Sequence, residues 1–90
     1  MNEQKIILQS LVMDLKRTAL NLHSGSRDVA EQFRGEALKW EKELEKYEHD
    51  EYLQGLLEKS KFSLYDRSEQ AAEDLLMYSV LLQNYVLKLK

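Results

Sequence analysis

The stretch ALNLHSGSRDVAEQF, residues 19–33, decides how this sequence folds. Ser24-Gly25-Ser26 is the strongest break in the chain, because Gly25 readily takes the left-handed conformation that ends a helix and Ser26 can cap the next one. Asp28 follows in the first turn of the second helix, where the helix dipole favours a negative charge. The stretch therefore predicts a junction between two helices.

Apolar periodicity on both sides of this junction predicts the two helices themselves. A helix over 2–23 has one broad apolar face, made of Ile7, Leu8, Leu11, Val12, Leu15, Ala19 and Leu22. A helix over 27–48 has one narrow apolar stripe, made of Val29, Phe33, Ala37, Trp40, Leu44 and Tyr47. Nearly all other positions of the second helix are charged or polar, so we expect an outer helix with one buried seam.

Beyond this stripe the pattern changes sides. The next apolar residues, Leu53, Leu56 and Leu57, lie roughly opposite the stripe, so a straight helix would not bury both sets against one core. We predict a turn near 49–50 with Asp50 as a cap, followed by a short helix over 51–61. A single bent helix is the alternative.

A last helix is predicted to end near Leu89. The boundary before this helix is predicted at 62–66, because Asp66 and Glu69 have the spacing of a capping box, and so do Ser63 and Asp66. Lys88 lies near the carboxyl end of the helix, where a cation suits the helix dipole.

Composition supports an all-α fold in one domain over 1–90. Ala, Glu, Lys, Leu and Arg make up 46 of the 90 residues, a share typical of long helices. Only seven residues are β-branched, so a sheet has little to be built from. We predict an antiparallel helical bundle of three long helices and one short helix. The sequence has no cysteine, which excludes a disulfide framework and a cysteine-based metal site.

Charge and hydropathy limit the partners. Sixteen acidic and thirteen basic residues give a net charge of −3, and the bases are interleaved with acids, so a nucleic-acid partner is not expected. The apolar-rich stretch 75–89 is interrupted by polar residues, so no membrane span is expected. The N-terminal residues lack the pattern of a signal peptide, and we expect a cytoplasmic protein.

The terminal helices each carry a second row of apolar residues, away from the main face. In the first helix the row repeats every seven residues and consists of Ile6, Met13 and Leu20. In the last helix the row consists of Leu76, Val80 and Leu87. A helix that is apolar on two sides is buried on two sides. Either both helices are central within one subunit, or these rows bind a second chain. We favour the second reading, which predicts a non-catalytic interaction or regulatory protein that forms a homodimer, binds a partner protein, or both.

Two further groups of side chains are interpreted as structural. Trp40 and most tyrosines lie on or beside the predicted core faces, and Tyr65 is the best candidate for an exposed aromatic residue. Glu41 and Glu45, with Glu48 or His49, lie on the polar side of their helix, so we interpret them as a solvated face. We expect no metal ion and no cofactor.

An enzymatic alternative depends on Arg17 and His23. Their Arg-x5-His spacing resembles the Arg-x4–6-His pattern of the RNA-cleaving members of the HEPN helical-bundle family. The resemblance implies paired subunits that bring arginine and histidine together in a composite site for cutting RNA. It covers seven residues, and Thr18 follows the arginine where that family often has a strongly polar residue.

Overall fold

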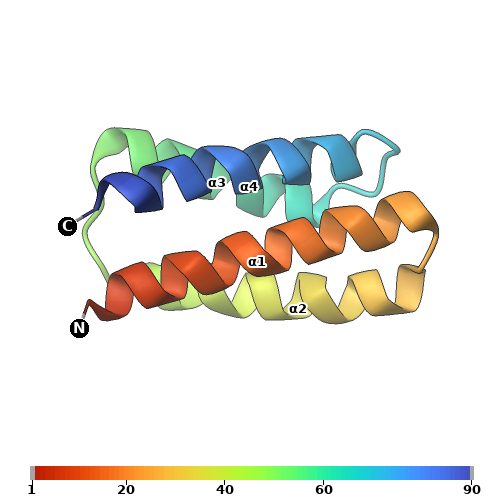
Figure 1. Ribbon diagram of the computed structural model, residues 1–90, viewed down its shortest axis with the longest axis horizontal. Helices are drawn as coiled ribbons and strands as arrows, with labels where there is room; N and C mark the ends of the chain where they lie inside the picture. The colour runs from red at the N-terminus through yellow and green to blue at the C-terminus, as the bar shows by residue number, and fades with distance from the viewer. Residues whose placement is uncertain (1, 90) are drawn as a thin grey trace.

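The computed structural model describes residues 2–89, and these form an antiparallel four-helix bundle (Figure 1). The helices are α1 (Glu3–Ser24), α2 (Arg27–Leu44), α3 (Glu51–Tyr65) and α4 (Ala71–Lys88). Within residues 2–89 the structure contains no strand. The predicted all-α antiparallel bundle is confirmed, and α3 is its shortest helix.

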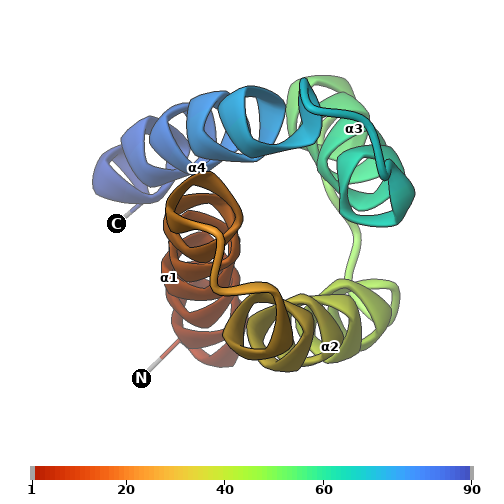
Figure 2. The ribbon, with the colours of Figure 1, turned by 90° about the vertical axis from the view of Figure 1, so that its right-hand side faces the viewer.

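The four helices stand at the corners of a square when the bundle is viewed along its length (Figure 2). Helix α1 packs extensively against both α2 and α4, and α3 packs mainly against α4. The contact between α2 and α3 is the smallest of these four. The start of α1 and the end of α4 lie at the same end of the bundle (Figure 1).

The junction between α1 and α2 forms as predicted. Gly25 has φ 84°, the left-handed conformation, and its backbone N–H points to the carbonyl oxygens of Asn21 and Leu22. At the other end of α1, the Asn2 side chain accepts a hydrogen bond from the backbone N–H of Lys5. Ser26 occupies the first cap position of α2, although its side chain makes no capping bond.

The break between α2 and α3 is confirmed, which excludes the single bent helix. Helix α2 ends at Leu44, four residues before the predicted end, and residues 45–50 connect the two helices. Asp50 caps α3, because its Oδ1 accepts a hydrogen bond of 2.7 Å from the backbone N–H of Leu53. Helix α3 then continues to Tyr65, four residues beyond the predicted end.

The predicted start of α4 at Asp66 is wrong. Asp66 instead accepts hydrogen bonds from the backbone N–H of Ser68, at 2.9 Å, and from the Ser68 hydroxyl, at 3.0 Å. These bonds hold the pKa of Asp66 below its ordinary value. An aspartate that binds the backbone two residues ahead stabilises a turn, so α4 begins only at Ala71.

The core is built mainly from leucine. The broad apolar face predicted for the first helix is confirmed, and the fully buried leucines of the core are Leu8, Leu11, Leu15, Leu44, Leu53, Leu64, Leu75 and Leu82. The prediction for α2 is partly wrong, because Val29 is 40% exposed while two charged residues of α2, Arg34 and Glu41, are buried. Helix α2 sits in a corner of the bundle, so one of its sides faces α1 and another faces α3.

Candidate functional site

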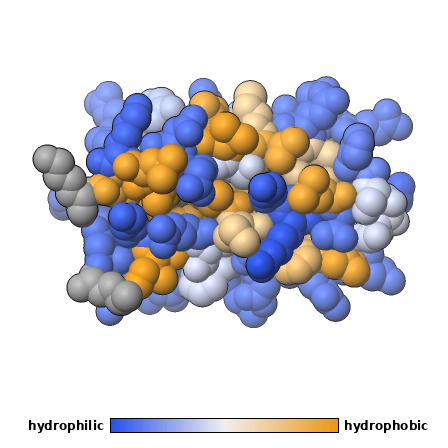
Figure 3. Space-filling model, in the orientation of Figure 1, coloured by the Kyte–Doolittle hydropathy of each residue, from blue (hydrophilic) through white to orange (hydrophobic). Residues whose placement is uncertain are grey.

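The second apolar rows of α1 and α4 remain uncovered. All six of their side chains are between 40% and 72% exposed, and we call this set the α1/α4 apolar face: Ile6, Met13, Leu20, Leu76, Val80 and Leu87. Figure 3 shows apolar side chains gathered along the side of the molecule that α1 and α4 form. Each of these helices packs on two neighbours, yet neither α2 nor α3 covers the second rows.

The two rows lie on adjacent antiparallel helices. Helix α1 begins at Glu3, at the end of the bundle where α4 ends at Lys88 (Figure 1). Helix α1 has 22 residues and α4 has 18, so α1 extends past the start of α4 at the other end of the bundle. The α1/α4 apolar face therefore follows both helices along one side of the bundle.

One further exposed apolar residue extends this face, and sequence reasoning missed it. Met77 of α4 is 46% exposed and lies between Leu76 and Val80 in sequence. The signal was visible in the sequence, because a methionine on the outer side of a helix that is already apolar on two sides widens the apolar surface. The exposed aromatic residues, Tyr52, Phe62 and Tyr65, lie instead on α3.

Basic residues flank the row on α1. Lys16 and Arg17 are both exposed and lie between Met13 and Leu20 in sequence. Arg17 is held within its own chain, because its Nη1 lies 3.6 Å from Asp14 Oδ1 and its guanidinium lies 5.3 Å from the centre of the Phe33 ring. On α4 the exposed acidic residue Glu73 lies three residues before Leu76 in sequence.

A second unusual feature is the polar contact between α2 and α3. The Arg34 side chain is buried and donates a hydrogen bond to the carbonyl oxygen of Leu64. Glu41 is 4% exposed, and its Oε2 lies 2.6 Å from the Ser60 hydroxyl. Burial raises the pKa of Glu41 to about 7, while the Ser60 bond and the charge of Lys61 act in the opposite direction.

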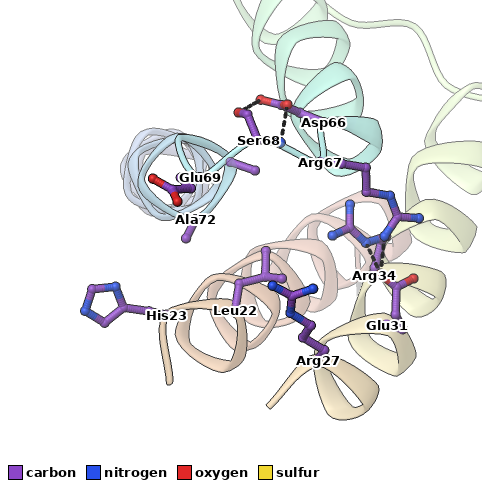
Figure 4. A pocket seen from close by; sticks show the side chains of 11 residues that line it. Leu22, His23, Arg27, Glu31, Arg34, Asp66, Arg67, Ser68, Glu69 and Ala72 are labelled. Atoms are coloured by element: carbon purple, nitrogen blue, oxygen red, sulfur yellow. Dashed lines mark hydrogen bonds and ion pairs between the residues drawn. The ribbon is translucent and has the colours of Figure 1, made fainter. Parts of the chain in front are cut away.

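The end of this polar contact opens into a cavity of about 360 Å³ (Figure 4). Three arginines line it, Arg27, Arg34 and Arg67, and both Arg34 and Arg67 form ion pairs with Glu31. The hydrogen bond from Arg67 holds the pKa of Glu31 below its ordinary value. Asp66 and Glu69 also line the cavity, so it carries both signs of charge, and Glu31 is the carboxylate that pairs with two of its arginines.

The predicted solvated acidic face of α2 is correct in part. Glu45 and Glu48 are exposed, but Glu41 points inward, and its interpretation as a solvated residue was wrong. The His49 ring lies 2.7 Å from the carbonyl oxygen of Leu44 and 2.9 Å from the Gln4 amide. Across residues 2–89 no group of three or more histidine, cysteine, aspartate or glutamate side chains is arranged to hold a metal ion.

Arg17 and His23 both lie inside α1 and point to different surroundings. Arg17 contacts Asp14 and Phe33, whereas His23 lines the cavity of Figure 4 at the far end of the helix. Six helical residues separate the two by about 9 Å along the helix axis. Within one chain they do not form a common site.

The aromatic residues are placed largely as predicted. Trp40 packs partly buried against the core, and its indole N–H donates a hydrogen bond of 2.8 Å to Asp14 Oδ2. Tyr78 and Tyr85 also pack partly buried against the core, and the Tyr85 hydroxyl donates a hydrogen bond of 2.9 Å to Asp50 Oδ2. Tyr65 is exposed, as expected.

No family model, curated protein or solved structure matches this chain. Within residues 2–89, none of the helices combines the length and the hydropathy of a membrane span. The choice of a candidate site therefore depends on the geometry of this chain alone. We choose the α1/α4 apolar face because its apolar side chains are exposed and take no part in the core.

Proposed function

We propose that this protein is a small non-catalytic interaction module whose α1/α4 apolar face binds another protein chain. The observation that carries the proposal is the exposure of six apolar side chains in two adjacent rows. Scattered apolar residues are normal on a protein surface, whereas a contiguous apolar patch usually marks a binding site.

Burial of this face supplies a substantial driving force. The exposed fractions of its six side chains add up to about three complete side chains. Full burial of one such side chain contributes about 1.5–3 kcal/mol, and this gain has to exceed the cost of lost translational and rotational freedom on association. Neighbouring contacts such as Met77 add to the buried area.

The face is also preorganised for binding. Each row lies on the outer side of a helix whose inner side is fixed in the core, by Leu11 and Leu15 in α1 and by Leu75 and Leu82 in α4. A surface on packed helices loses little conformational entropy when it binds, so most of the burial energy remains available for affinity.

The test is to place a charge in the middle of each row. Met13→Glu and Val80→Glu each put a carboxylate into the buried interface, which strongly weakens binding through this face. Phe62→Glu is the matched control, because Phe62 is an exposed apolar residue of α3, outside the face. Association is measured for the purified protein by sedimentation, and for captured partners by mass spectrometry.

The expected result is that the two face variants lose an association that wild type and Phe62→Glu retain. Circular dichroism checks that all variants keep the helical fold. If wild type and both face variants show the same self-association and capture the same proteins, the face is not the binding surface and the proposal fails.

A further inference from the structure

We propose that the cavity of Figure 4 binds a small phosphate monoester, whose phosphate group is held by Arg27, Arg34 and Arg67. The cavity lies at the end of the bundle where α1 is followed by α2 and α3 by α4. None of the six residues of the α1/α4 apolar face lines it, so this inference is independent of the proposed function.

The three arginines reach the cavity from two parts of the chain. Arg27 and Arg34 are seven residues apart on α2, which is about two helical turns, so their side chains leave the same side of the helix. Arg67 belongs to the connection between α3 and α4. Figure 4 shows the three guanidinium groups on one side of the cavity, whereas Glu69 and His23 lie on the other side.

The carboxylates near these guanidinium groups do not saturate them. A single oxygen, Oε1 of Glu31, pairs with both Arg34 Nε, at 3.2 Å, and Arg67 Nη1. The Asp66 carboxylate is bonded to Ser68, which donates to it from its backbone N–H and its hydroxyl. Three positive charges therefore lie near two negative ones, and one of these carboxylates already has its hydrogen bonds elsewhere.

Arg34 is the fixed donor of the site. It is 4% exposed, and its Nη1 donates a hydrogen bond to the carbonyl oxygen of Leu64. Its Nε is buried and, although Glu31 lies within ion-pair distance, forms no hydrogen bond of normal geometry. Burial lowers the pKa of Arg34 and the charge of Arg67 lowers it further, while Glu31 acts in the opposite direction. A bound anion offsets the repulsion between the two guanidinium groups, and a side chain that is already held in place loses little entropy on binding.

The arrangement of the donors favours a phosphate over a carboxylate. Guanidinium groups bind both anions through paired N–H groups. A carboxylate presents two oxygens in one plane, whereas the phosphate of a monoester presents three oxygens around a tetrahedral centre. Three guanidinium groups from different positions match the three oxygens better.

The rest of the cavity limits the organic part of the ligand. Its volume of about 360 Å³ is near the lower end of the range of about 300–1,000 Å³ that is typical of small-molecule sites. Leu22 of α1 and Ala72 of α4 add apolar side chains to the lining. The fourth phosphate oxygen can therefore carry a small organic group.

The test is a titration of the purified full chain with glycerol 3-phosphate, followed by calorimetry and by NMR, with inorganic phosphate and acetate as comparison anions. Arg27→Gln should weaken the binding of glycerol 3-phosphate by about tenfold or more, since it removes a hydrogen bond between charged groups. Arg27 is exposed, so this change should leave the fold intact. Lys42→Gln is the matched control, because Lys42 is an exposed cation of the same helix and does not line the cavity.

A second variant is expected to act in the opposite direction. Glu31→Gln removes the carboxylate that competes with the ligand for Arg34 and Arg67, so it should strengthen binding. Glu36→Gln is its control, because Glu36 is an exposed acid of α2 outside the cavity.

The outcomes decide both the site and the class of ligand. Opposite effects of Arg27→Gln and Glu31→Gln, with unchanged binding in the two controls and NMR shifts confined to 22–34 and 66–72, support the proposal. Absence of saturable binding, acetate binding as tight as that of glycerol 3-phosphate, or an equal loss in Lys42→Gln overturns it. Tighter binding of inorganic phosphate than of glycerol 3-phosphate overturns the monoester as the ligand.

Discussion

Glu41 on α2 and Ser60 on α3 are joined by a 2.6 Å contact inside the bundle, at the smallest of its four main helix–helix contacts. The Ser60 hydroxyl also lies 3.1 Å from the carbonyl oxygen of Leu57, and its single hydrogen serves only one acceptor at a time. When the Ser60 hydroxyl donates to Glu41 Oε2, it favours the ionised carboxylate and lowers the pKa of Glu41. Burial of the carboxyl outweighs this bond and raises the pKa of Glu41 to about 7.

The first prediction is that the bundle loses stability as pH rises. The pKa of Glu41 in the folded state is about 7, above its ordinary value of 4.5, so the folded protein holds this proton more tightly than the unfolded chain. The tighter binding of this proton stabilises the folded protein fully below pH 4.5. This stabilisation is lost as pH rises from 4.5 to about 7, and no further change from Glu41 is expected above about pH 7. The free energy of unfolding, measured by urea denaturation, should drop by on the order of 2–3 kcal/mol between about pH 5 and about pH 8.

Glu41→Gln is expected to flatten this part of the pH dependence, since a neutral amide keeps the shape of the side chain and has no proton to lose. Glu48→Gln is the control, because Glu48 is exposed and does not contribute to the pKa shift of Glu41. If Glu41→Gln has the same pH dependence as wild type, Glu41 is not the group responsible.

The second prediction concerns the cap of α3. Asp50→Ala removes the acceptor for the Leu53 N–H and for the Tyr85 hydroxyl, so it should destabilise the bundle by about 1–2 kcal/mol. Tyr85→Phe keeps the cap and loses only the hydroxyl bond, and we expect a smaller effect. Chemical denaturation of the two variants measures both contributions, and an equal loss in both would show that the cap contributes nothing.

The third prediction contrasts two glycines. Gly25 has φ 84°, so Gly25→Ala forces a side chain into the left-handed region and should cost about 1 kcal/mol. Gly35 lies inside α2 with no atom within 4 Å of an added Cβ, so Gly35→Ala should stabilise the protein by about 0.5–1 kcal/mol. Thermal unfolding of the pair tests both signs, and a destabilised Gly35→Ala would contradict the open space at that position.

The fourth prediction concerns the centre of the core. Leu15 is fully buried among the core leucines, so Leu15→Ala should destabilise the bundle by about 2–5 kcal/mol through lost burial and the cavity left behind. Leu20→Ala removes a similar side chain from the exposed row of the same helix. In isolated subunits it should cost much less, and an equal loss in both variants would contradict the exposure of that row.

Much of the fold follows from local patterns in the sequence. Gly25 and Asp50 end or begin helices for reasons that lie within a few residues, and both predictions are confirmed. The start of α4 was missed because Asp66 has two local options, a helix cap and a turn at Ser68, and the spacing to Glu69 fits the first equally well. Only the path of the chain between α3 and α4 decides between them.

The polar contact between α2 and α3 was not predictable from periodicity. Arg34 and Glu41 are seven residues apart on one side of α2, and such a row is normally solvated. Burial of this row follows from the position of α2 in a corner of the bundle, where the Leu64 carbonyl and the Ser60 hydroxyl supply partners from a distant helix. By contrast, the exposed rows on α1 and α4 were visible in the sequence, because a second apolar side on a helix needs no knowledge of its neighbours.

The packing of α1 against α4 has a consequence for how the chain reaches its native state. Helix α1 leaves the ribosome before α4, which covers one side of its inner face. A nascent hairpin of α1 and α2 therefore has leucine side chains exposed to solvent until α4 has been synthesised. In this interval the growing polypeptide is open to chaperones and to aggregation, and the core closes only once α4 has emerged.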